Sequence, residues 1–408
     1  MNLIKYLFFL LLLYLFIYNP PFQFLSVSPV ELMIIPAFLY IAVSWKWYPF
    51  LKIFWAEILI FLLIALYSYF RDLGSIDSVF FRANILLLLE SLVIPYFIIL
   101  LYSKIKGKEN LIKEVIYIGI FASLITLAMI AIPSLNALIR NQVLKGNEFD
   151  EFLTFRSFGL AEGLTFAYGI VQGLIFAFVF YYSRQNSKYL VLLPLILLSI
   201  FFNARVGMIP VIIAIIYFVI IKLDVKFILL SICFALASYL IIFQSPLFSD
   251  YAETIEWAFD FFNQSSDFLT GNADKAEVNT FTTLFGDMAV FPQNTSEWIV
   301  GTGENIFLLN QGNSDVGYLI QINYGGLLYM FLIVVLMARV FWRMKFLFLE
   351  NKWFVILLFL TVVLGNVKGL FISVNPNFRL IMLLFCYIIL EHRRNPKAMD
   401  NIFSVSNG

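Results

Sequence analysis

Twelve apolar runs, many of them about as long as a membrane-spanning helix, cover most of this chain and constrain its fold more than any other feature. A helix needs about 20 largely apolar residues to cross the hydrocarbon core, and each span must satisfy its own backbone hydrogen bonds. We therefore expect an all-α, polytopic membrane protein with about 12 transmembrane helices. The runs lie near residues 3–18, 30–44, 54–70, 85–102, 111–132, 161–182, 189–202, 206–221, 227–243, 317–338, 353–372 and 377–390.

The composition agrees with this fold class. Apolar residues make up 62% of the 408 residues and charged residues only 13%, far from the balance of a soluble domain. The two cysteines, Cys233 and Cys386, lie inside apolar runs, so neither a disulfide framework nor a metal site is expected. The first run ends in Asn19-Pro20-Pro21 without a small-residue cleavage site, which favours an uncleaved first span.

Lysine and arginine are divided unequally between alternate loops. Eighteen of the 27 fall in the set that includes both termini, which predicts that both termini are cytoplasmic. The other, outer set holds six arginines and three lysines, and the planar guanidinium suits bidentate binding of phosphate. Arg82, Arg140 and Arg379 are candidate substrate ligands in this set, although Arg82 and Arg379, taken singly, fit interfacial anchors better.

The segment from Tyr189 to Ile221 is one apolar run that only Asn203-Ala204-Arg205 interrupts. A single helix of that length would measure about 50 Å against a core of about 30 Å, and both flanks carry cytoplasmic-type charges. The chain is therefore predicted to cross outward and return. Because each arm has only about 14–16 residues, Arg205 is expected at or below the outer head-group level, either as a paired tip residue or, as we prefer, at the depth of a lipid phosphate.

Two outer loops are predicted. Residues 133–160 carry Arg140 and the motif Phe155-Arg156-Ser157-Phe158-Gly159. Glu162, at the mouth of the next span, is a further candidate substrate-binding residue. Residues 244–316 form a large acidic loop, with eleven Asp or Glu and one Lys between 245 and 315. It separates residues 1–243, with nine spans, from residues 317–408, with three spans and a cytoplasmic tail.

Charge and residue types limit the chemistry. The acidic loop argues against nucleic-acid binding and is compatible with a hydroxyl-rich ligand such as sugar, although most of its carboxylates are better explained as solvated. The only histidine, His392, lies in the cytoplasmic tail, so any general base outside must be a carboxylate. No metal or cofactor motif is present. Glu90, inside the fourth span, is equally well explained as a functional acid or as a hydrogen-bonded structural one.

Three motifs together resemble the O-antigen polymerase (Wzy-type) and O-antigen ligase superfamily. They are Phe155-Arg156-Ser157-Phe158-Gly159, Asn203-Ala204-Arg205-Val206-Gly207, and Gly301-Thr302-Gly303 followed by Asn313-Ser314-Asp315-Val316-Gly317-Tyr318-Leu319 and Gly325-Gly326-Leu327. The resemblance covers roughly residues 150–330 by motif and the whole chain by topology. It implies a metal-independent, GT-C-like glycosyltransferase of the bacterial cytoplasmic (inner) membrane, with its active site facing the periplasm or exterior.

The substrates that the resemblance implies are undecaprenyl-pyrophosphate-linked glycans, with a chain-length regulator and a flippase as compatible partners. Arg205 and Arg156 would hold the pyrophosphate, Asp315 would act on the acceptor hydroxyl, and Asn313 and Tyr318 would bind substrate. Ligases of the superfamily carry histidine where this chain has Ser314, which favours a polymerase that makes O-antigen or capsule. A transporter of the same lipid-linked units, or a ligase, remains the alternative.

Overall fold

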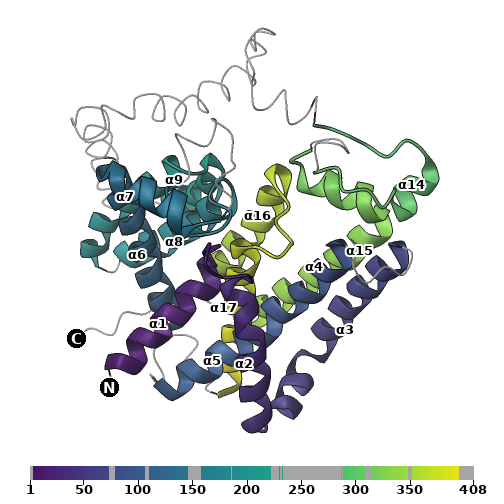
Figure 1. Cartoon of the computed structure of the whole chain (residues 1–408), viewed down its shortest axis with the longest axis horizontal. Helices are drawn as coiled ribbons and strands as arrows, with labels where there is room; N and C mark the ends of the chain where they lie inside the picture. Colours follow the sequence, from purple (N-terminus) through teal and green to yellow (C-terminus); the bar gives the residue numbers. More distant parts are fainter. Residues whose placement is uncertain are drawn as a thin grey trace.

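The computed structural model describes residues 3–72, 79–105, 110–145, 158–184, 186–221, 288–307, 314–347 and 352–394, together with residues 229, 232 and 286. Every regular element within these ranges is a helix, and the expected all-α fold class is confirmed there (Figure 1). Arg156, Asn313, Cys233 and most of the long acidic loop lie outside the described residues.

Fourteen α-helices are described. They are α1 (Leu3–Tyr18), α2 (Pro29–Val43), α3 (Trp47–Arg71), α4 (Val79–Leu88), α5 (Ile94–Ile105), α6 (Leu111–Ala131), α7 (Pro133–Leu138), α8 (Ala167–Ser183), α9 (Leu193–Phe201), α10 (Met208–Ile215), α14 (Thr295–Val300), α15 (Gly317–Leu347), α16 (Lys352–Lys368) and α17 (Pro376–Arg394). Short π-helical or 3-10 segments join several of them: η1 (Leu89–Val93), η2 (Ile139–Val143), η4 (Ser187–Leu192), η5 (Arg205–Gly207) and η6 (Ile216–Ile221).

Four helical stretches of the described chain are long and apolar enough to cross a membrane: Trp47–Arg71, Val79–Lys104, Leu111–Ala131 and Gly317–Lys345. Five shorter apolar helices accompany them, including Ser187–Phe201 and Arg205–Phe218. These two have the lengths predicted for the arms of the hairpin at Arg205. The multi-pass character of the protein therefore follows from its helices, while the count of 12 spans stays a prediction.

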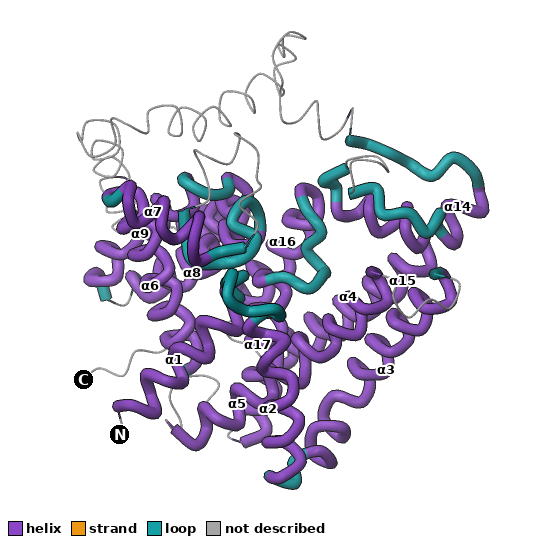
Figure 2. The backbone as a smooth tube through the Cα atoms, in the orientation of Figure 1, coloured by secondary structure: helices purple, strands orange, loops and turns teal. Residues whose placement is uncertain are grey.

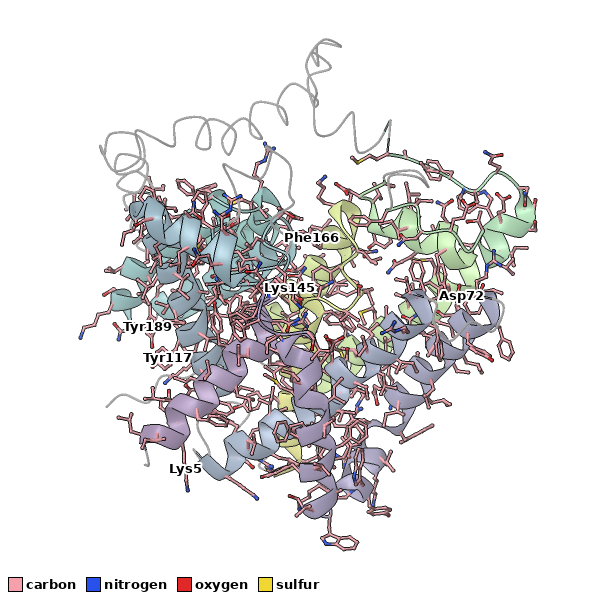
Figure 3. All side chains as sticks on the ribbon, in the orientation of Figure 1. Lys5, Asp72, Tyr117, Lys145, Phe166 and Tyr189 are labelled. Atoms are coloured by element: carbon pink, nitrogen blue, oxygen red, sulfur yellow. The ribbon has the colours of Figure 1, made fainter. Side chains whose placement is uncertain are left out.

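Helix α17 is the central element of the bundle. Every residue from Pro376 to Leu390 is buried. It packs against α1, α5, α8, α15 and η1. Figure 1 shows α6 to α9 on one side of it and α3, α4 and α15 on the other. In Figure 2 most of the described loops gather at one end of the bundle, and in Figure 3 Phe166 lies at that end and Lys5 at the opposite one.

A π-helical segment interrupts the helix formed by α4 and α5, and Pro95 explains it. Proline has no amide hydrogen, so it cannot bond to the carbonyl of Ser91 four residues earlier. The chain widens into η1 at that point, and the Ser91 carbonyl instead accepts the Cys386 thiol of α17 at 3.8 Å. The widened turn contains Glu90, which is 2% exposed. Segments of this kind often occur at functional sites.

Helix α15 is broken at Gly326, where φ is 64° and ψ is −168°. Residues other than glycine essentially never adopt this backbone conformation. The break frees the carbonyls of Asn323 and Tyr324, which then accept hydrogen bonds from the amides of Thr302 (2.6 Å) and Gly303 (3.0 Å). The Gly301-Thr302-Gly303 motif therefore completes the broken helix with its own backbone. The sequence predicts a single span over residues 317–338, and the break divides it.

Candidate functional site

The segment between α9 and α10, which carries Arg205, is joined to Phe158 near the end of the predicted outer loop 133–160. Asn203 is fully buried, accepts a hydrogen bond from the Phe158 amide (2.8 Å), and donates one to the Phe158 carbonyl (2.8 Å). The Asn203 side chain thus forms both a donor and an acceptor hydrogen bond with Phe158, as the backbone of a neighbouring β-strand would. Thr126 adds a third bond, to the same carbonyl at 2.9 Å. Two motifs that the sequence separates by more than 40 residues therefore meet, and Arg205 lies half-buried beside the junction.

Glycines bring this hairpin tip against α8 at backbone distance. A Cβ on Gly169 would overlap the carbonyl of Ala204, and one on Gly207 would overlap the carbonyl of Gly169. A Cβ on Gly173 would likewise meet Gly207. Small residues at this spacing allow helices in membranes to approach closely. The backbone around Arg205 is consequently held on one side by α8 and on the other by Asn203.

The second arginine region belongs to the same part of the fold. Ile139, one residue before Arg140, packs into an apolar cluster with Phe158 and Phe202. Arg140 is half-buried, and burial lowers the pKa of its guanidinium, which still carries its charge near neutral pH. Arg156 precedes Phe158 by two residues in the sequence but lies outside the described residues.

Asp315 lies just before α15 and forms an ion pair with Lys368 at the end of α16. The Asp315 Oδ2 to Lys368 Nζ distance is 3.1 Å, and the two side chains are 38% and 35% exposed. Gly317 fixes this arrangement, because a Cβ there would overlap the carbonyl of Gly369. Gly369 in turn lies against the ring of Phe166, just before α8 (Figure 3). The start of α8 therefore lies between the Asp315–Lys368 pair and the segment that carries Arg205.

Ser314 is fully buried. Its hydroxyl donates to the Met288 carbonyl at 2.6 Å and accepts from the Val316 amide at 3.3 Å. The serine therefore fixes the start of α15. Tyr318, a half-buried residue one turn further on, donates its hydroxyl to the Val363 carbonyl at 2.8 Å.

Arg379 on α17 is 1% exposed and contacts two carboxylates. Its Nε lies 3.0 Å from Glu90 Oε2, and its Nη2 contacts Glu162 Oε1. Nη1 donates to the Phe16 carbonyl at 3.1 Å. Asn19 donates to the other oxygen of Glu162 at 2.7 Å. Arg379 thus connects the C-terminal end of α1, the π-helical turn and the segment before α8.

The structure thus places the predicted site residues in three groups. Arg205 and Arg140 belong to the region around Phe158, Asp315 and Tyr318 to the start of α15, and Arg379 and Glu162 to the buried ion-pair cluster. Arg82 lies exposed on α4. The described residues include no group of three or more His, Cys, Asp or Glu that could hold a metal ion.

Two ion pairs in these groups were not predicted from the sequence. Lys368, at the end of α16, pairs with Asp315, which is 53 residues away in the sequence. Glu90 lacked a partner because Arg379 follows it by almost 300 residues. The available signal was that both are charged residues next to apolar runs, where an unpaired charge is costly.

Comparison with models of known protein families and with curated proteins gives no match to this chain. The function proposed below rests on the residues and contacts already described.

Proposed function

We propose that this protein polymerises undecaprenyl-pyrophosphate-linked oligosaccharides at the outer face of the bacterial cytoplasmic membrane. The growing glycan is transferred from its lipid pyrophosphate to the next lipid-linked repeat unit, and the product is a surface polysaccharide such as O-antigen or capsule. Both termini are cytoplasmic in this proposal, and residues 244–316 cover the outer face. The chain itself needs neither metal nor cofactor, because the donor is already activated as a pyrophosphate.

The observation that carries the proposal is the junction between Asn203 and Phe158. It links the Arg205 hairpin to the segment that follows Arg156, and these two segments contain the arginines expected to bind pyrophosphate. A guanidinium offers paired donors to phosphate oxygens. Held by a buried amide and by glycine packing, Arg205 would need little reorganisation as charge develops on the leaving group.

In the proposed reaction, an acceptor hydroxyl attacks the anomeric carbon of the donor's reducing-end sugar. A glycosidic C–O bond forms, the C–O bond to the pyrophosphate breaks, and undecaprenyl pyrophosphate leaves with the bonding electron pair. Asp315 takes the hydroxyl proton. Its carboxylate lies 3.1 Å from Lys368 Nζ, and its exposure of 38% leaves it accessible to such a hydroxyl.

A transporter of the same lipid-linked units is the second candidate, and the break in α15 favours it. Discontinuous membrane helices commonly form the binding sites of transporters. The buried Ser314 argues against a ligase, because its hydroxyl donates one hydrogen bond to the backbone and accepts another from it. The ligase alternative would require another group to replace the histidine.

The test uses purified full-length protein in detergent with lipid-linked repeat units. A ladder of longer glycans supports polymerisation, whereas absence of a ladder together with movement of the units across a vesicle bilayer supports transport. Arg205→Lys keeps the charge but loses the planar fork, and we expect a reduction in rate of at least tenfold, or about 1.4 kcal/mol. Arg393→Lys, at the exposed cytoplasmic end of α17, is the matched control. A full-length ladder from Arg205→Lys would refute the pyrophosphate clamp.

A further inference from the structure

A second arginine site lies between α3 and α15, far along α15 from the Gly301-Thr302-Gly303 motif. Glu57 of α3 is completely buried and contacts two arginines of α15. Arg343 Nη1 lies 2.7 Å and Arg339 Nε 3.1 Å from the same carboxylate oxygen, Oε1. Two guanidinium groups share one carboxylate, so the three side chains together carry a charge of +1.

The two arginines are bound differently. Arg343 is only 15% exposed, also donates to the Ile53 carbonyl at 3.2 Å, and lies over the rings of Phe54 and Phe385. Arg339 is 33% exposed and contacts Glu57 through Nε alone. Its two terminal nitrogens donate no hydrogen bond to the described part of the chain. The uncompensated charge therefore lies on a guanidinium edge that is open to the surroundings.

Two exposed tryptophans show at what level of the membrane this edge lies. Trp342, beside Arg343 on α15, is 56% exposed, and Trp55, two residues before Glu57 on α3, is 62% exposed. Exposed tryptophans of membrane proteins concentrate at the head-group level. From there toward the break in α15, Val334 and Phe331 are exposed apolar side chains, as expected for a surface in contact with acyl chains.

We propose that the free edge of Arg339 binds the phosphate of an anionic phospholipid whose acyl chains lie along α15. The paired terminal nitrogens match two phosphate oxygens. A net charge of +1 prefers an anionic lipid over a zwitterionic one, and basic sites between transmembrane helices are suited to such head groups. This site is independent of the proposed polymerisation.

The test is native mass spectrometry of the full-length protein in detergent with added phosphatidylglycerol, phosphatidylcholine or inorganic phosphate. We expect one phosphatidylglycerol to bind in preference to phosphatidylcholine, and Arg339→Gln to weaken that binding by about fivefold. Glu57 keeps Arg343 in this variant, which protects the fold. Arg339→Lys retains the charge and the ion pair and should weaken binding less.

Lys345→Gln is the matched control, because Lys345 is exposed near the same end of α15 but lies two residues from Arg343 and therefore on another face. The preference for phosphatidylglycerol should persist in it. The proposal is overturned if Lys345→Gln weakens phosphatidylglycerol binding as much as Arg339→Gln does. The attraction would then be a general property of the basic residues at this end of α15. Unchanged binding by both Arg339 variants, or equal binding of inorganic phosphate, would also overturn it.

Discussion

Replacing Arg379 by methionine should be among the most destabilising single changes in the described chain. Methionine fills a similar volume without charge and leaves Glu90, which is 2% exposed, without its 3.0 Å partner. Breaking a buried ion pair by removing one partner costs about 3–5 kcal/mol. Loss of the contact with Glu162 adds little to this cost, because the Glu162 side chain is 27% exposed and keeps its hydrogen bond from Asn19. We expect a loss of about 3 kcal/mol.

The companion change Glu90→Gln should cost less, about 1–2 kcal/mol. Arg379 would still contact Glu162 and the Phe16 carbonyl, so no charge would be left without a partner. In the double variant, Arg379→Met with Glu90→Gln, a neutral amide replaces the Glu90 carboxylate, so no buried charge is left without a partner. The double variant should therefore be more stable than Arg379→Met alone, with a coupling of at least about 1.5 kcal/mol.

The assay is thermal unfolding of purified protein in one detergent at one scan rate. At about 2 °C for each kcal/mol, Arg379→Met should lower the Tm by roughly 6 °C. Arg393→Met, an exposed site on the same helix, should stay within about 1 °C and serves as the control. If the effects of the two single changes simply add in the double variant, Glu90 and Arg379 do not stabilise each other and the reasoning fails.

Two further changes probe the backbone near the site. Gly326→Ala forces a left-handed φ of 64° on alanine and places a Cβ into the backbone of Ile299, so we expect a loss of at least about 3 kcal/mol in the same unfolding assay. Gly286→Ala, where no heavy atom within the described part of the chain approaches a Cβ within 4 Å, should be close to neutral, and a similar loss in both would contradict the strain argument. Asn203→Leu removes both hydrogen bonds between the buried Asn203 side chain and the Phe158 peptide group, which should cost about 1–3 kcal/mol. Wild-type stability of Asn203→Leu would mean that the junction does not hold the two segments together.

Periodicity and length predicted the local structure of this chain well. Within the described residues the apolar runs form helices as predicted, whereas most of the predicted span 227–243 lies outside them. The interruption at Asn203-Ala204-Arg205 lies where α9 ends and α10 begins. The lengths of those two arms follow from counting residues between charges. Such features depend on neighbouring residues only, so one sequence contains all the information that they require.

Contacts between distant segments were not predictable in the same way. Glu90 and Arg379 each have an ordinary local context, and nothing in either context selects the other as a partner. The break in α15 had a local signal in Gly325-Gly326, since paired glycines mark a possible interruption. Its repair by Gly301-Thr302-Gly303 depends on tertiary structure.

Exposure separates the charges that hold this fold together from those that can reach a substrate. Arg379 is 1% exposed, and its guanidinium contacts Glu90, Glu162 and the Phe16 carbonyl. Its replacement should therefore lower the stability of the protein. Asp315 and Lys368 are each more than a third exposed, and Arg205 is half-buried at the hairpin tip. Charges in such positions contribute little to stability. Under the proposed function, changes at Arg205 should therefore lower activity at nearly constant Tm, whereas changes at Arg379 should lower both together.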